Sequence, residues 1–148
     1  MTTNERQFRI TKSQLDKLHA ALTGFDLDAA TRCIGSRVLA DAELAALKSQ
    51  ASDLSNEIRD YEALKSGTIS VLKARNLSEL PTILIRARIA KGLSQQALAE
   101  KLGLKEQQIQ RYESEEYSSA SLRRLAEVAE ALNLNITGVA EFTDARAA

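Results

Sequence analysis

The chain has few of the residues that carry most enzyme and metal chemistry. Its 148 residues include one histidine, His19, one cysteine, Cys33, one proline and no tryptophan. A lone cysteine cannot form an internal disulfide, which favours a reducing compartment. One histidine and one cysteine are too few soft ligands for a structural zinc site. Phosphate-loop and nucleophile-elbow motifs are also absent. We therefore expect no enzyme activity, no metal and no cofactor.

A long apolar run is missing as well. The composition, 44% hydrophobic and 27% charged residues, is typical of a soluble globular protein. No stretch is apolar and long enough to span a membrane. The opening MTTNERQFRI carries charges but is not followed by the apolar core of a secretory signal. We therefore expect a cytoplasmic protein.

Neither sign of charge dominates, because 20 basic residues balance 20 acidic ones. This balance argues against a protein that coats nucleic acid indiscriminately. The charge is nevertheless uneven along the chain, since residues 81–111 hold six cations and two anions. The cations are Arg86, Arg88, Lys91, Lys101, Lys105 and Arg111, and the anions are Glu100 and Glu106; Arg123 and Arg124 follow. A local excess of this kind can steer DNA towards one face of a protein.

The N-terminal half, residues 1–66, is predicted to be mainly helical. Residues 7–11 read as a short strand, residues 12–23 as a helix, residues 24–40 have no clear assignment, and residues 41–65 read as a long helix. The apolar seam of the long helix alternates spacings of three and four: Leu44, Leu47, Ala51, Leu54, Ile58 and Tyr61. This spacing is typical of a coiled coil. Two alternatives stay open, an intramolecular helical hairpin with residues 12–23 or a short coiled coil between chains.

Residues 67–77 read either as a linker or as a short strand that pairs with residues 8–10. Residues 78–142 are predicted to form a compact domain with helices over 78–91, 94–102, 105–114 and 121–132. Ser78 is expected to cap the first of these helices, with Pro81 in its first turn. In the last helix, the side chains expected to face the core are Leu122, Leu125, Val128, Ala129 and Leu132. The residues expected to close the core after this helix are Leu134, Ile136, Val139 and Phe142. Residues 143–148 are expected to be a flexible tail.

Residues 93–113, LSQQALAEKLGLKEQQIQRYE, predict two short helices joined by a tight turn at Gly103. Ala99 is small where two helices must cross closely, and Gly103 supplies the left-handed conformation of the turn. Around them, a set of residues recurs at fixed spacings: Arg88, Leu93, Gln95, Leu98, Ala99, Leu102, Gly103, Ile109, Arg111, Glu113, Leu122, Leu125, Ala129 and Leu132. With these residues, the segment from Pro81 to Ile136 resembles the helix-turn-helix of the Cro/repressor-like (XRE) family of bacterial and phage regulators. The resemblance implies a mainly all-α chain with a lambda-repressor-like domain of four or five helices at its C-terminal end.

The second helix of this pair presents a polar face of Glu106, Gln107, Gln110 and Arg111. Glutamine pairs best with adenine and arginine with guanine in the major groove, at about 1–3 kcal/mol of discrimination each. Glu106 could accept from cytosine N4, favour the helix dipole or repel wrong sites. The alternative is that these side chains form only a solvent-exposed face with no binding role. Because they lie in a four-helix domain of known DNA-docking geometry, we favour contacts with DNA bases.

Other roles follow from the resemblance alone. It implies that Gln95 bonds a DNA phosphate, with Gln96 and Lys105 as helpers and Arg123 as a weaker contact. It also implies that Arg88 and Glu113 form an internal salt bridge. The segment departs from the family where Lys105 and Glu106 replace the usual serine or threonine at the start of the recognition helix. We therefore expect no side-chain cap there, with water or a DNA phosphate on the free N–H groups.

The sequence thus predicts a repressor-like transcriptional regulator that binds a palindromic double-stranded operator as a homodimer. One such domain covers only a half-site, and residues 1–66 would supply dimerisation or partner binding. Small bacterial regulators with this resemblance often serve as antitoxins, and the opening NERQFRITKSQLDKL looks like that group. The alternatives are therefore an antitoxin that neutralises a protein toxin and represses its own operon, or a purely protein-binding module. We expect a cytoplasmic protein of bacterial type, associated with the nucleoid when bound.

Overall fold

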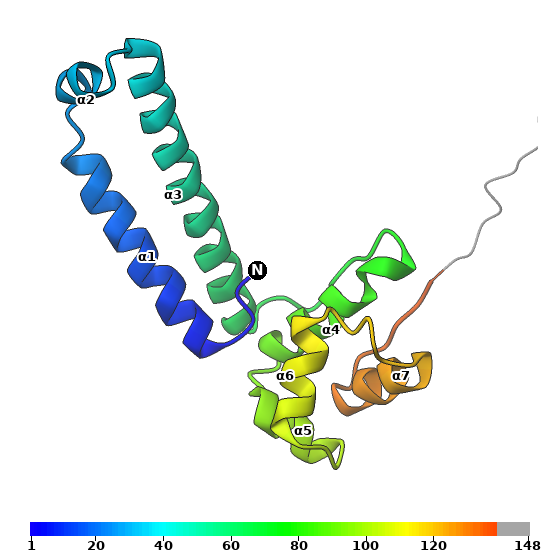
Figure 1. Cartoon of the computed structure of the whole chain (residues 1–148). Helices are drawn as coiled ribbons and strands as arrows, with labels where there is room; N and C mark the ends of the chain where they lie inside the picture. The colour runs from blue at the N-terminus through cyan, green and yellow to red at the C-terminus, as the bar shows by residue number, and fades with distance from the viewer. Residues whose placement is uncertain (139–148) are drawn as a thin grey trace, which may run out of the picture.

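Helices are the only regular secondary structure in the part of the chain that the structure describes. A computed structural model describes residues 1–138, which contain three helices in the N-terminal half and a helical cluster in the C-terminal half (Figure 1). The helices are α1 (Glu5–Thr23), α2 (Leu27–Ile34), α3 (Arg37–Lys65), the 3₁₀ turn η1 (Leu77–Glu79), α4 (Leu80–Ala90), α5 (Gln95–Lys101), α6 (Glu106–Ser114) and α7 (Leu122–Ala131). Residues 1–138 contain no strand. The all-α prediction is confirmed, and no helix of this part is long and apolar enough to cross a membrane.

The N-terminal half forms a hairpin in which α1 packs along α3 and α2 lies at the end remote from α4–α7 (Figure 1). The apolar seam of α3 is the face turned towards α1. Ala51 and Tyr61 are buried in it, and Leu44, Leu47, Leu54 and Ile58 are half-buried. Of the two alternatives for this seam, the structure adopts the intramolecular hairpin.

Two expectations about this half were wrong, the strand at residues 7–11 and the start of the long helix at residue 41, and helix caps explain both. Residues 7–11 lie inside α1, because the Asn4 side chain accepts a hydrogen bond from the Gln7 N–H at 2.9 Å and starts the helix earlier. Residues 24–40, which had no assignment, contain α2, capped by Asp26 and ended by Gly35 at φ +77°. Ser36 then caps α3, so that helix starts before residue 41.

The sequence left two alternatives open for residues 67–77, a linker or a short strand. No strand forms in this segment, whose residues before η1 lack regular structure. Four alternating residues could not distinguish a strand from an extended linker. Ser78 lies within η1 rather than capping a helix, whereas Pro81 does lie in the first turn of α4.

The hydrophobic core lies among α4–α7 and extends into the base of the hairpin. Its most buried large side chains are Leu84, Ile85, Leu98, Ile109, Val128 and Leu132. Tyr61 and Leu64 of α3 belong to the same cluster, and Phe8 of α1 stacks on Tyr61 with ring centroids 5.0 Å apart. Fully burying each such leucine or isoleucine contributes about 1.5–3 kcal/mol. The hairpin base and the C-terminal helices therefore share one core. The boundaries at residues 66 and 78 stay a prediction.

The last helix only partly follows its predicted inward face. Val128, Ala129 and Leu132 are buried, and Leu125 and Leu134 pack half-buried against the core. Leu122 is 70% exposed, because it directly follows the cap residue Ser121 at the outer start of α7. Ile136 is 50% exposed and does not close the core. Val139, Phe142 and the tail at 143–148 lie outside the described residues.

Candidate nucleic-acid interface

The turn between α5 and α6 is built as the sequence predicts. The Ser94 hydroxyl accepts from the Ala97 N–H at 3.0 Å and starts α5. Leu98 and Ala99 are buried where α5 meets α6. Gly103 has φ +65°, a left-handed conformation that L side chains adopt at a cost of about 1–2 kcal/mol. The short Ala99 side chain and the glycine turn therefore fix how α6 projects from the domain.

Helix α6 separates a buried face from an exposed one. Ile109 and Glu113 are buried, whereas the four side chains of the predicted reading face are exposed: Glu106, Gln107, Gln110 and Arg111. The Gln110 amide donates to Glu106 at 3.0 Å. Arg111 has a carboxylate neighbour, Glu115, at 3.9 Å. Within residues 1–138, the Gln107 side chain makes no hydrogen bond. Gln107 and Arg111 are therefore the side chains of this face with the weakest contacts to the rest of the protein.

The Lys105 side chain makes no cap at the start of α6, as the sequence predicts, but Gln108 reaches back to the Lys105 N–H. The Gln108 side chain accepts from the Lys105 N–H at 3.0 Å, and the Gln108 N–H donates to the Lys105 carbonyl at 2.9 Å. The first bond is the reciprocal half of a capping box, which Gln108 supplies from inside the helix. Lys105 itself is exposed. Gln96, also exposed, donates to Glu100 at 2.9 Å.

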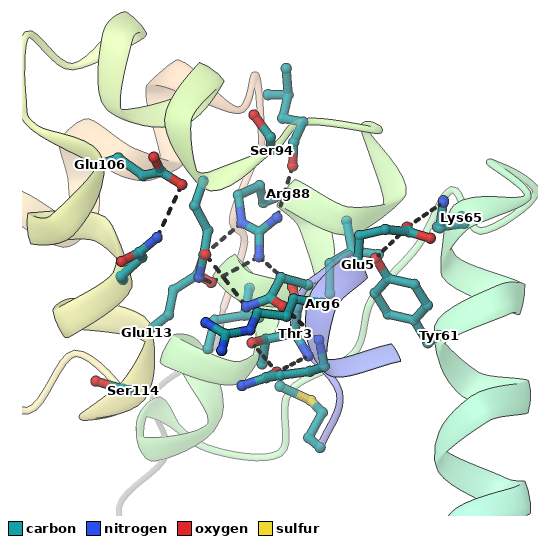
Figure 2. Close-up of a pocket in the computed structure, with 18 of the residues that line it drawn as sticks. Thr3, Glu5, Arg6, Tyr61, Lys65, Arg88, Ser94, Glu106, Glu113 and Ser114 are labelled. Carbon is teal, nitrogen blue, oxygen red and sulfur yellow. Dashed lines mark hydrogen bonds and ion pairs between the residues drawn. The ribbon is translucent and has the colours of Figure 1, made fainter. Parts of the chain in front are cut away.

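Arg88 and Glu113 form a buried salt bridge behind the exposed face of α6 (Figure 2). The Arg88 Nε and Nη2 atoms donate to the two Glu113 oxygens at 2.6 and 2.8 Å. Nη1 donates to the Leu93 carbonyl at 2.8 Å, and Nη2 also donates to the Thr3 carbonyl at 2.7 Å. The side chains are only 3% and 1% exposed. A two-pronged arginine–carboxylate pair with its remaining donors satisfied fixes α4 against α6. It also removes Arg88 from the surface charge that could attract DNA.

Gln95, predicted to contact a phosphate, belongs to the same network. Its side-chain amide donates to Glu113 at 2.7 Å, and its carbonyl oxygen accepts from Asn4 at 3.5 Å. Only 8% of Gln95 is exposed. Thr3 and Asn4 therefore cover this part of the domain. Sequence reasoning missed both residues, because their contacts reach 85 and 91 positions along the chain and leave no local pattern.

The remaining predicted phosphate contact, Arg123, lies at the surface of α7. Its side chain is 90% exposed, with Nε 3.3 Å from Glu127, which also pairs with Arg124 at 2.7 Å.

In the loop after α6, Glu116 and Tyr117 have positive φ values of 48° and 56°. Tyr117 is buried against Tyr112, with ring centroids 5.7 Å apart, and its hydroxyl has no partner in the described structure. Burial raises the pKa of Tyr117, so its phenol stays neutral.

A cleft of about 1280 Å³ separates the exposed face of α6 from the first turns of α1. Glu106, Gln107, Gln110 and Arg111 line one side, and Arg6 and Arg9 line the other. At the edge of the cleft, Lys65 donates to Glu5 at 2.8 Å (Figure 2). This bond lowers the pKa of Glu5 and raises the pKa of Lys65. Residues of the C-terminal helices and of the N-terminal hairpin therefore line the same cleft.

Residues 84–139 match a family model described as Helix-turn-helix. No curated protein and no solved structure matches the chain. The protein therefore carries a helix-turn-helix DNA-binding domain, a class typical of non-enzymes. The domain is of the Cro/C1 (XRE) type, and it covers a little over a third of the chain. Its presence makes DNA the expected partner and confirms the resemblance on which the sequence analysis rested.

Proposed function

We propose that the protein is a sequence-specific, repressor-like transcriptional regulator that places α6 in the major groove of DNA. The observation that carries this proposal is the division of α6 into two faces. Ile109 and Glu113 anchor the helix in the domain, while four polar side chains project from it. A helix held in this way can present base-reading groups without rearrangement, because its orientation is fixed by the core.

Gln107 and Arg111 are the proposed base readers. They lie one helical turn apart, and neither is held by a strong partner within residues 1–138. Glu106 and Gln110 hydrogen-bond each other, so we assign them a secondary role at the same face. Gln96, Lys105 and Arg123 are the proposed phosphate contacts, and all three are exposed. Gln95 would bond a phosphate only if its side-chain amide, which donates to the buried Glu113, turned towards the surface.

We propose that the protein acts as a homodimer, since one domain of this size covers one half-site. The seam of α3 is occupied by α1 within the chain, so it does not supply the dimer contact proposed from the sequence. We propose that residues 1–66 mediate dimerisation or partner binding through their outer surface. Residues 67–77 connect them to the DNA-binding domain, proposed at residues 78–142.

Selection of bound sequences from random double-stranded DNA tests the proposal. We expect one enriched motif made of two inverted half-sites with centres about 10–10.5 base pairs apart, or a multiple of that spacing. A single enriched half-site would contradict the dimer and keep base reading by α6. A pool that stays random after several rounds, with folded protein, would contradict the proposed function.

An antitoxin role is the second candidate, and the hairpin end remote from α4–α7 favours it. Ile34, Val38 and Leu39 are 39%, 76% and 57% exposed there. Clustered exposed apolar side chains commonly mark protein-binding surfaces. This role predicts that removing the gene while its neighbour stays intact arrests growth, and that restoring it rescues growth. Unchanged growth would count against the antitoxin role without affecting DNA binding.

A further inference from the structure

The cleft beside α6 has a basic wall that lies outside the helix-turn-helix domain. Arg6 and Arg9 of α1 line the cleft opposite Gln107 and Arg111. Figure 2 shows Arg6 in front of the buried pair of Arg88 and Glu113. Both α1 arginines are exposed. Within residues 1–138, neither has a carboxylate within 4.0 Å, so their charges are not consumed by an ion pair.

The first turn of α1 is held at this place by contacts that cross the two halves of the chain. The Thr3 carbonyl accepts from Arg88, and Asn4 donates to Gln95 while its side chain caps α1. Thr2, only 4% exposed, donates to Glu57 of α3 at 3.1 Å. The position of Arg6 and Arg9 relative to α6 is thus set by part-buried hydrogen bonds to α3, α4 and α5.

Two of the four carboxylates that line the cleft are paired with a cation. Glu5 is bonded to Lys65 and Glu113 to Arg88. Glu106 accepts only from the neutral amide of Gln110, so it keeps its negative charge. Glu116, after α6, is the remaining carboxylate that lines the cleft without a partner within 4.0 Å in the described part of the chain. The lining carries five arginine or lysine side chains against four carboxylates, so its formal charge is slightly positive, which favours an anionic ligand.

We infer that Arg6 and Arg9 contact DNA phosphates and so extend the DNA interface from the helix-turn-helix onto α1. When a recognition helix enters the major groove, sugar-phosphate strands run along its flanks. The cleft lies along such a flank of α6, with the two arginines on its far side. This inference rests on the proposed function, because it takes α6 as the groove-inserted helix. Its chemistry is distinct, because phosphate contacts add affinity without base preference.

The test compares the double variant Arg6→Ala/Arg9→Ala with Arg32→Ala/Arg59→Ala, which removes the same charge away from the cleft. Binding to a selected duplex and to a scrambled duplex is measured by fluorescence anisotropy across a salt series. We expect the cleft variant to lose about tenfold or more in affinity for both duplexes at about 0.1 M salt. Its plot of log affinity against log salt should be shallower by about two units. Arg6→Lys/Arg9→Lys should restore the slope, and circular dichroism checks that each variant is folded.

A cleft variant that binds like its Arg32/Arg59 control would overturn the inference. So would tighter binding, since α1 would then obstruct DNA, and so would a loss confined to the selected duplex. Failure of the proposed function has a different signature, in which the unmodified protein binds both duplexes equally while the salt slope still depends on Arg6 and Arg9. Unmodified protein that binds neither duplex would overturn both.

Discussion

Replacing Glu113 with alanine should lower the free energy of unfolding by about 3–5 kcal/mol. The substitution leaves the Arg88 guanidinium charged and 3% exposed, and it removes the acceptors of the Nε and Nη2 bonds. The Gln95 amide also loses its acceptor at 2.7 Å. A buried charge without a partner costs more than the net gain of the intact pair, because its lost hydration is no longer offset. Urea unfolding followed by circular dichroism measures the change.

Two control variants distinguish the contribution of the buried salt bridge to stability from that of an exposed one. Arg123→Ala breaks an exposed contact with Glu127, and we expect it to cost less than about 1 kcal/mol. The double variant Arg88→Met/Glu113→Leu removes both charges and should lose less stability than Arg88→Ala and Glu113→Ala combined. If Glu113→Ala unfolds at nearly the same urea concentration as Arg123→Ala, the pair does not stabilise the fold as described.

The parts of the fold that the sequence predicts are those with short-range causes. Helical spacing placed α4–α7, and the small Ala99 and left-handed Gly103 placed the turn between α5 and α6. These features depend on neighbours within a few residues, so one sequence carries their signal. The strand expected at residues 7–11 failed for a local reason, since the capping side chain of Asn4 outweighs a few residues of alternation.

The missed parts have long-range causes. The contacts of Thr3 and Asn4 with Arg88 and Gln95 depend on how the hairpin docks, and no spacing encodes that docking. For the same reason Gln95 was expected at the surface and lies buried. The candidate site is thus divided. The exposed face of α6 follows from helical periodicity, whereas the opposing wall at Arg6 and Arg9 emerges only when distant segments meet.

Replacing Arg111 with alanine should weaken binding to the selected DNA by about 1–3 kcal/mol, which is roughly 5- to 150-fold. The preference at one base pair should relax in the same variant, because a guanidinium contacts guanine with two donors. Gln107→Ala should act similarly at a neighbouring position. The fold should be little affected, since the ionic neighbour of Arg111 is an exposed carboxylate at 3.9 Å. Affinity is measured on every single-base variant of the selected half-site.

Arg111→Lys distinguishes base reading from charge alone. Lysine keeps the positive charge but lacks the rigid two-pronged donor pair of arginine. We therefore expect this variant to retain the salt dependence of binding while losing much of the preference at one base pair. Arg32→Ala, on the remote end of the hairpin, should leave affinity and base preference unchanged. Arg111 and Gln107 have the weakest side-chain contacts on the exposed face of α6, so they are the best placed there to contact bases. If Arg111→Ala and Gln107→Ala both keep the base preference of the unmodified protein, another surface contacts the bases.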